Sequence, residues 1–304
     1  MILCAGEALI DMLPRETAAG ENAFAPHAGG AVFNTSIALG RLDVPVQFFS
    51  GISSDLFGDM LRAQLAASSV DSSPAAISDR PTTLAFVTLT DGHASYAFYD
   101  ENTAGRMLSP DDLPDVTPQT LFVGGISLAV EPCAQTYEAL VAQHSKTAVV
   151  MMDPNVRPSF IADADHYRTR IGRMLDHCDI VKLSDEDLAW FMPDTSTEDA
   201  AHRLVEDGVR LVCVTQGAIG VTGYTPDHTV FVPAEKARVV DTVGAGDTFN
   251  AGVLASLHQA DALHKDKIAN LDEDTIRNAL AYGAKVAAIT VSRAGANPPW
   301  VSEL

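Results

Sequence analysis

A nine-residue stretch, Asp-Thr-Val-Gly-Ala-Gly-Asp-Thr-Phe at positions 241–249, combines glycines and a carboxylate in a way that suits the transfer of an anionic group. Gly244 and Gly246 allow positive φ and close approach of the backbone to a ligand, and the small Ala245 leaves that approach open. We expect a helix from about Asp247 to His258, whose free N–H groups would add to an anion-binding turn. Asp247 could act as a general base toward an attacking hydroxyl. The alternative is an ordinary N-cap after a glycine turn.

A second stretch, Ala-Gly-Gly-Ala-Val-Phe-Asn-Thr-Ser at positions 28–36, could hold a polyol. Gly29 and Gly30 permit close backbone approach before a helix predicted from about Asn34 to Leu42. Asn34, in the first turn, offers both a donor and an acceptor, although it could simply cap the helix.

The elements that must position these residues alternate along the chain. Apolar runs at 121–123, 148–152, 180–183 and 211–214 are separated by helical stretches, which predicts a parallel sheet covered on both faces. Ile2–Ala5 is expected as a further buried strand, continued through Asp11. The Asp11 carboxylate could accept hydrogen bonds from neighbouring hydroxyls or be a solvated strand end. Arg157 follows one run at the carboxyl edge, where its guanidinium could clamp phosphoryl oxygens or form a surface ion pair.

The two glycine stretches resemble the C-terminal and N-terminal signatures of the ribokinase-like carbohydrate kinases, which move the γ-phosphoryl group of ATP to a sugar or nucleoside hydroxyl. The run Asp-Pro-Asn-Val-Arg at 153–157 is also similar to theirs. The resemblance covers nearly the whole chain, and no GxxxxGK[ST] motif competes with it. It implies a single α/β kinase domain over residues 1–304, a ribokinase-like three-layer sandwich with a mostly parallel central sheet and a small β-sheet lid.

Segments near 12–28 and 82–104 are expected to form that lid. Residues 82–90 and 94–99 are β-rich and flank Asp91-Gly92, a strong hairpin signal. Closing a lid over the sugar would exclude water from the transfer. The hairpin could instead be an edge of the main sheet. The outer face of the strands must be solvated or paired, so a homodimer through the lid is left open.

The resemblance also implies roles for individual residues. Asp247 would be the base, with Gly244, Ala245, Gly246 and Arg157 stabilising the transferred group. The residues implied for the sugar are Asp11, Gly29, Gly30 and Asn34. The residues implied for the nucleotide are Ser184, Asp187, Thr215, Gly217, Gly220 and Thr242. Mg²⁺ would have no direct protein ligand and would be held through phosphates and water, with Asp187 or Glu186 as the carboxylate nearby. A need for K⁺ is left open.

Ser184 and Asp187 depart from the family's Asn-x-x-Glu motif, so hydrogen-bonding capacity and charge persist with shorter reach. As an alternative, Ser184 followed by Asp-Glu-Asp is a good helix N-terminus. Gly217 and Gly220 could likewise mark a hairpin between strands at 211–215 and 221–224. By resemblance, a C-terminal helix from about Asp272 to Ile289 should close the adenine pocket.

Composition limits the partners. With 20 Lys and Arg against 40 Asp and Glu, the net charge of −20 disfavours nucleic acid and anionic membrane surfaces. The four cysteines are scattered through apolar stretches, which predicts buried thiols rather than a zinc site or a disulfide framework. No signal peptide and no apolar run of about 20 residues is evident. We therefore expect a cytoplasmic protein whose partners are a small sugar and ATP.

The segments 6–11 and 28–31 most resemble fructokinases and their relatives, the 2-keto-3-deoxygluconate kinases. The acid needs a cation, and acid-specific relatives carry an Arg after the lid strand. Here Asp100 and Glu101 follow Tyr99 instead, which favours a neutral sugar. Arg106 and Arg157 keep the acid as an alternative. We expect fructose, phosphorylated on a primary hydroxyl, then 2-keto-3-deoxygluconate, then another neutral sugar or nucleoside. A catalytically weak sugar-binding regulator is the alternative from another class.

Overall fold

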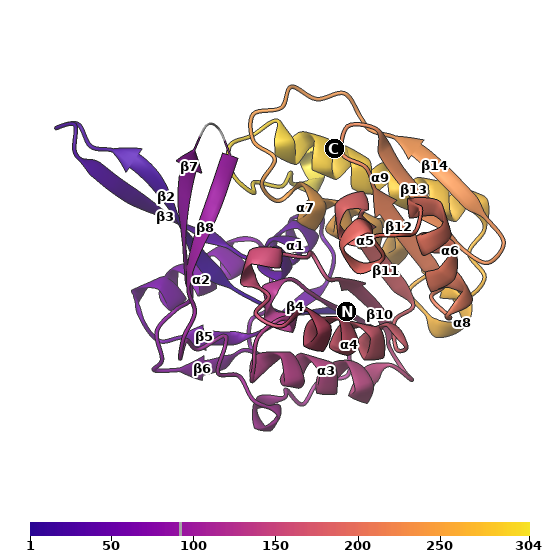
Figure 1. Cartoon of the computed structure of the whole chain (residues 1–304), viewed down its shortest axis with the longest axis horizontal. Helices are drawn as coiled ribbons and strands as arrows, with labels where there is room; N and C mark the ends of the chain where they lie inside the picture. Colours follow the sequence, from indigo (N-terminus) through magenta and orange to yellow (C-terminus); the bar gives the residue numbers. More distant parts are fainter. Residues whose placement is uncertain (91–92) are drawn as a thin grey trace.

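The computed structural model describes residues 1–90 and 93–304, and its centre is an eight-stranded sheet (Figure 1). The strands, in spatial order, are β14 (Thr229–Pro233), β13 (Gly220–Tyr224), β12 (Leu211–Thr215), β11 (Ile180–Ser184), β10 (Val149–Asp153), β9 (Thr120–Gly124), β1 (Ile2–Ala5) and β4 (Val46–Phe49). From β12 to β4 every pairing is parallel, and β13 and β14 are antiparallel additions at one edge. The predicted mostly parallel sheet is confirmed.

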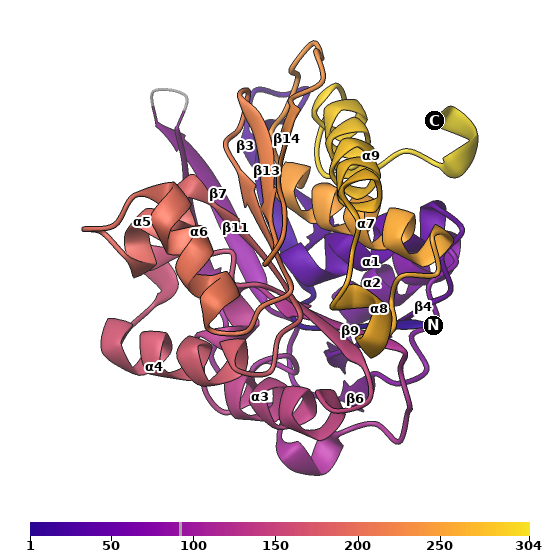
Figure 2. The ribbon, with the colours of Figure 1, turned by 90° about the vertical axis from the view of Figure 1, so that its right-hand side faces the viewer.

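Helices cover both faces of this sheet (Figure 2). One face carries α1 (Ala31–Arg41), α2 (Leu56–Ala67), α7 (Ala245–Gln259), α8 (Lys265–Ile268) and α9 (Glu273–Val291). The other carries α3 (Cys133–His144), α4 (Ala164–Leu175), α5 (Asp185–Phe191) and α6 (Thr197–Glu206). Short 3₁₀ turns lie at Pro110–Asp112, Ile126–Leu128, Pro158–Phe160 and Val301–Glu303. Because strand side chains alternate, Ile2 and Cys4 join one hydrophobic core, and Leu3 and Ala5 join the other. All four cysteines are buried and unpaired, as predicted.

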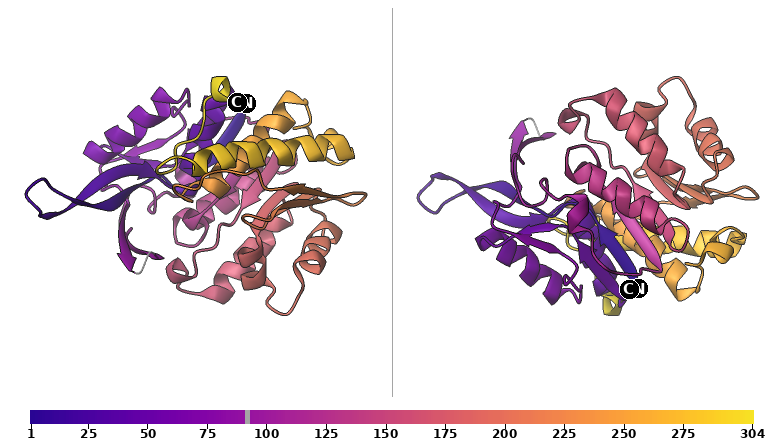
Figure 3. Two further views of the ribbon diagram at one scale, coloured as in Figure 1. Left: turned by 90° about the horizontal axis from the view of Figure 1, so that it is seen from above. Right: turned by 90° about the horizontal axis from the view of Figure 1, so that it is seen from below.

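A separate four-stranded sheet stands beside this body, and its β2–β3 hairpin projects well beyond it (Figure 3). Its order is β3 (Asn22–Gly29), β2 (Leu9–Glu16), β7 (Leu84–Thr90) and β8 (His93–Tyr99). We call it the small sheet. The segments near 12–28 and 82–104, which were expected to form the lid, therefore contain most of the strand residues of one sheet, separate from the main one. The hairpin turn predicted at Asp91-Gly92 lies outside the described residues.

One strand prediction is wrong in its boundary. The first strand does not continue through Asp11, because the chain bends at Gly6, where a Cβ atom would lie 2.4 Å from Val32 Cγ2 of α1. Asp11 therefore belongs to β2 of the small sheet. The segment 46–53 is divided between two sheets. β4 ends at Phe49, and β5 (Gly51–Ser53) pairs with β6 (Ala76–Ser78) in a two-stranded sheet.

Candidate active site

A cavity of about 290 Å³ opens at the carboxyl edge of the main sheet. Its wall includes residues that follow β1, β9 and β10, residues of the small sheet, and the start of α7. The predicted site residues that line it are Asp11, Gly30, Asn34, Arg157, Thr242, Gly244, Ala245, Gly246 and Asp247. The two signatures, distant in sequence, thus meet at one cavity. This is the crevice in which open α/β sheets place ligands.

The turn before α7 has the shape expected at Gly244 and a different one at Gly246. Gly244 is the N-cap of α7 with φ 78°, so the prediction of positive φ is confirmed there. Gly246 is the second helical residue and has no positive φ. Its glycine has another cause, because a Cβ atom would lie 3.1 Å from Lys182 Nζ. The Ala245 N–H donates to Thr242 O (3.3 Å), whereas the N–H groups of Gly244, Gly246 and Asp247 have no backbone acceptor among the described residues.

Asp247 is the third residue of α7 and is buried, with 7% of its surface exposed. Its Oδ2 accepts a hydrogen bond from Asn34 Nδ2 (2.9 Å), and its carbonyl accepts one from Thr35 Oγ1 (3.0 Å). The N-cap interpretation of Asp247 is wrong, since Gly244 occupies that position and no side chain caps the helix. Asn34 donates to the carboxylate instead of capping its own helix, because α1 begins earlier than predicted, at Ala31.

The pKa of Asp247 lies well above that of an ordinary aspartate. Burial raises it to about 7, because the charged form loses water. The hydrogen bond from Asn34 opposes this rise, the charge of Asp153 adds to it, and the cations Lys182 and Arg157 oppose it. A carboxylate that ionises near neutral pH is suited to general-base catalysis.

A buried polar network lies beside the first turn of α7, and the sequence analysis assigned it no role. Lys182 Nζ is 3.0 Å from Asp153 Oδ2, and Asn250 Nδ2 donates to the same oxygen at 2.7 Å. Both charged side chains are almost fully buried. The signal was present in the sequence, since a lysine inside an apolar strand needs a partner to be buried.

On the sugar side, the carboxylate of Asp11 occupies the space that a side chain at position 29 would need. Strand pairing sets Leu9 opposite Gly29, and a Cβ atom on Gly29 would lie 2.2 Å from Asp11 Oδ2. Gly29 itself is absent from the cavity wall, so its glycine leaves room for Asp11 rather than for a ligand. Burial raises the pKa of Asp11 to about 6. Gly30, with φ 109°, is the N-cap of α1.

Ser184 and Asp187 form a capping box and do not line the cavity. Asp187 Oδ2 accepts from the Ser184 N–H (2.9 Å), and Oδ1 accepts from the Val156 N–H (2.9 Å). The helix-N-terminus interpretation of this segment is therefore confirmed. Glu186 is exposed. Thr215 lies opposite Ser184 across β11 and β12, farther along the same edge of the sheet.

Gly217 and Gly220 also lie away from the cavity wall, in the predicted hairpin between β12 and β13. Gly220 has φ 140°, and a Cβ atom there would lie 2.3 Å from Val232 O of the neighbouring strand. Gly217 has φ 52° and open space around it. Strand pairing thus accounts for Gly220, whereas Gly217 leaves room beside its turn.

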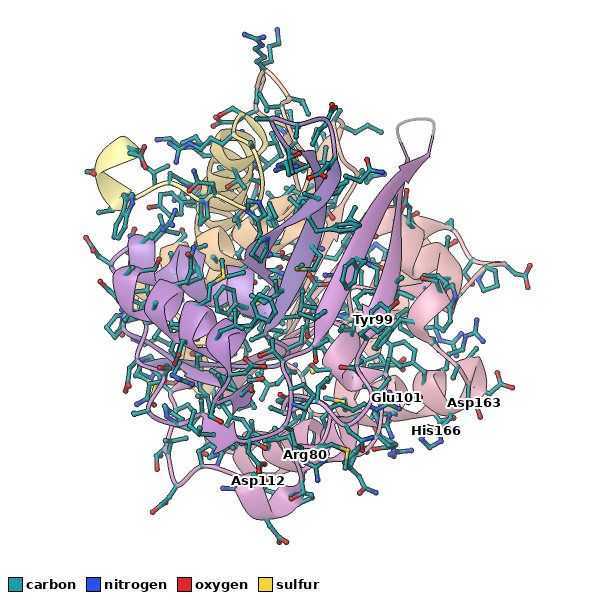
Figure 4. The ribbon with its side chains drawn as sticks, turned by 90° about the vertical axis from the view of Figure 1, so that its left-hand side faces the viewer. Arg80, Tyr99, Glu101, Asp112, Asp163 and His166 are labelled. Atoms are coloured by element: carbon teal, nitrogen blue, oxygen red, sulfur yellow. The ribbon has the colours of Figure 1, made fainter. Side chains whose placement is uncertain are left out.

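From the sequence we expected the carboxylates of Asp100 and Glu101, which follow β8, to lie near the sugar. The structure places neither of them in the cavity wall. Asp100 is buried elsewhere, where its Oδ1 accepts from Thr83 Oγ1 (2.8 Å). Tyr99 and Glu101 are exposed on the surface beside β8 (Figure 4). Arg106 Nη1 lies 3.6 Å from Asp100 Oδ2 and also stays outside the cavity wall. Arg106 is therefore not a free cation for an acidic sugar.

The doubly covered parallel sheet, the small sheet and a buried carboxylate of near-neutral pKa beside free amides fit a kinase of the ribokinase-like class. Residues 1–303 match the model of the pfkB family carbohydrate kinases, and the chain belongs to this family. A fructokinase from Rhizobium leguminosarum bv. trifolii is 54% identical over 280 residues, which are 91% of this chain and 86% of that protein.

Solved structures agree. The fructokinase from Xylella fastidiosa with bound ATP superposes with a TM-score of 0.91 at 30% identity, over 99% of this chain and 96% of that one. A fructokinase double mutant from Vibrio cholerae O395, bound to fructose, ADP and a potassium ion, gives 0.86 at 26% identity, over 97% and 93%. The predicted ribokinase-like fold is confirmed. No helix in the described residues is long and apolar enough to cross a bilayer.

Proposed function

We propose that this chain is an ATP-dependent fructokinase that transfers the γ-phosphoryl group to a primary hydroxyl of fructose. The observation that carries the proposal is Asp247, a buried carboxylate with a pKa raised to about 7, placed in the cavity between sugar-side residues and the free amides of α7. The 54% identity to a fructokinase supports the choice of sugar.

In this proposal the protein groups divide the work. Asp11 and Asn34 orient the sugar through its hydroxyls, and Asp247 takes the proton of the attacking hydroxyl. The N–H groups of Gly244 and Gly246 stabilise negative charge on the transferred group. Arg157 lines the same cavity, and within the described part of the chain it donates only to the carbonyl of Val156 (3.1 Å), so its guanidinium remains available for phosphoryl oxygens.

ATP supplies the phosphoryl group, and we propose that Mg²⁺ accompanies it through phosphate oxygens and water. The described residues contain no group of three or more His, Cys, Asp or Glu arranged to hold a metal. Mg²⁺ commonly keeps several waters and binds through substrate phosphates. Asp187 or Glu186 would contact it only through water. Thr215 and Gly217 would lie on the nucleotide side. The potassium ion in the Vibrio cholerae structure keeps a K⁺ requirement open for this chain.

Charge favours a neutral sugar over a keto acid. Among the residues that the structure describes, Glu7, Asp11 and Asp247 line the cavity together with a single cation, Arg157. A further carboxylate would meet net negative charge there. A coupled ADP-release assay across a sugar panel tests this: we expect kcat/KM to be highest for fructose. A preference of about tenfold or more for 2-keto-3-deoxygluconate would overturn the choice of sugar, and calorimetric binding without turnover would favour a regulator.

We further propose that the small sheet acts as a lid. Leu9, Asp11 and Phe98, from β2 and β8, already line the cavity, so movement of the sheet would open or close it. Its aromatic side chains Phe24, Phe86 and Tyr99 stack edge to face, and Phe24 and Tyr99 are exposed. A homodimer through the small sheet would cover these exposed side chains. Light scattering tests for the dimer, and a fully active monomer at micromolar concentration would rule out an obligatory dimer.

A further inference from the structure

Glu7 is a buried carboxylate in the cavity wall that the mechanism above leaves without a role. It lies between β1 and β2, and only 8% of its surface is exposed. Burial raises its pKa, and backbone N–H groups oppose that rise. Such a carboxylate needs hydrogen bonds to offset the loss of water.

Two glycines make room for Glu7, one beside its backbone carbonyl and one beside its carboxylate. Gly30 has φ 109°, and a Cβ atom there would lie 2.8 Å from Glu7 O. Gly125 has φ 71°, and a Cβ atom there would lie 2.0 Å from Glu7 Oε1. Both backbone conformations disfavour other residues. The chain thus adapts at two distant points to keep Glu7 at this position.

The carboxylate joins two elements of the cavity wall. Oε1 accepts a hydrogen bond from the N–H of Ala31 (2.9 Å), and Ala31 is the first residue of α1. Oε2 accepts a hydrogen bond from the N–H of Ser127 (3.4 Å). The N-cap residue of α1 makes no side-chain capping hydrogen bond. Glu7, which is 24 residues from Ala31 in the chain, caps the helix instead. An ionised carboxylate can accept about four hydrogen bonds. Besides these two donors, the Glu7 N–H and the Ser127 side chain also lower the pKa of the carboxyl. Because the Ser127 hydroxyl donates to Gly124 O (2.9 Å), the carboxylate keeps acceptor capacity toward the cavity that it lines.

We propose that Glu7 is a further sugar-binding residue, whose carboxylate accepts a hydrogen bond from a hydroxyl of the acceptor sugar that is not phosphorylated. The same carboxylate holds the start of α1, and with it Asn34, in position. This inference rests on the proposed function, because it concerns how the acceptor sugar is recognised. It separates two tasks: Asp247 acts on the reacting hydroxyl, and Glu7 distinguishes sugars by a remote one.

The test compares wild type and Glu7→Gln on fructose and on analogues that each lack one secondary hydroxyl. The glutamine amide has one acceptor oxygen where glutamate has two, so it cannot accept hydrogen bonds from both the backbone and the sugar hydroxyl. KM for fructose should therefore rise about 10- to 100-fold, the loss typical of a hydrogen bond to a charged group. KM for ATP should change by less than about twofold. On the one analogue that lacks the hydroxyl bound by Glu7, wild type and variant should differ by less than about threefold.

Equal losses on every analogue would mean that Glu7 only supports the wall, and this would overturn the proposal. An unchanged KM for fructose would do the same. Asp100→Asn is the matched control, since Asp100 is also a buried carboxylate but lies outside the cavity wall, and its effect should not depend on the analogue. Circular dichroism checks that each variant folds.

Ala31→Pro provides a second variant in case Glu7→Gln does not fold. Proline is tolerated at the first position of a helix, and it removes the N–H bonded to Glu7 Oε1. It should weaken discrimination at the same hydroxyl, and unchanged discrimination would contradict the proposal. If wild type fails to phosphorylate fructose, the choice of sugar is wrong, and the analogue series is built on the sugar that the panel identifies. An active wild type with a non-selective Glu7→Gln rejects only the role of Glu7.

Discussion

Asn34 Nδ2 lies 2.9 Å from Asp247 Oδ2, and this hydrogen bond joins side chains 213 residues apart in the chain. It stabilises the ionised carboxylate, so Asn34→Ala should raise the pKa of Asp247 further. The acid limb of the kcat–pH profile should move upward by about 1 to 2 pH units, the equivalent of one hydrogen bond to a charge.

Thr35→Val is the control for that variant. Thr35 Oγ1 bonds the backbone carbonyl of Asp247 (3.0 Å) and does not touch the carboxylate. Its loss should lower stability and leave the profile where it was. Equal shifts in both variants would show that packing between α1 and α7, rather than the Asn34 amide, sets the ionisation.

Asp247→Asn should remove the base and keep the shape of the site. General-base help is typically worth about 10²–10⁴-fold, so kcat should fall by that factor. Calorimetry should still detect ATP and sugar binding of nearly wild-type strength. Turnover close to that of wild type would refute the assignment of Asp247.

The same substitution should stabilise the protein at high pH. Asp247 has a pKa of about 7 in the fold against an ordinary value of 3.8, so the fold favours its protonated form. Its ionisation therefore costs nothing below about pH 4, costs more as the pH rises to about 7, and stays costly above. Asparagine copies the neutral form. The Tm of Asp247→Asn should exceed that of wild type at pH 8, with a smaller excess at pH 5, and a gain independent of pH would contradict this.

Gly244→Ala should damage both the fold and the turn. Positive φ costs an alanine about 1–2 kcal/mol, and its Cβ atom would lie 2.6 Å from Ala296 Cβ. Gly208→Ala is a matched control, with φ 118° and nothing within 4 Å. Urea unfolding should show a loss in both variants, and larger at Gly244. Only Gly244→Ala should also impair kcat/KM. Loss of activity in the control would point to global destabilisation.

Local patterns in the sequence predicted the strands, the covering helices and the meeting of the two signatures. They failed where a contact between distant segments determines the backbone conformation or the role of a residue. Gly246 was expected to adopt a positive φ. The local sequence does not show that Lys182 Nζ lies close by and leaves little room for a Cβ atom there. The strand from Ile2 was continued through Asp11 because the apolar pattern persists past the bend at Gly6.

The roles on the nucleotide side remain predictions for a physical reason. Ser184 and Asp187 were read from family position, and their hydrogen bonds in the structure are those of a helix start. Gly220 is explained by its neighbour strand. Glu7 was missed because a lone Glu after a buried strand carries no spacing signal, and its partners at Ala31 and Ser127 come from remote segments.

Two strands of the small sheet join the body close to the cavity. β2 begins at Leu9, two residues after Glu7, and β3 ends at Gly29, two residues before Ala31, the first residue of α1. A tilt of the sheet would therefore be transmitted to the sugar side through these short connections. The exposed turn at 17–21 lies at the far end of the β2–β3 hairpin, away from every cavity-lining residue. A fluorophore attached there would turn the protein into a sugar sensor whose signal follows the angle of the sheet.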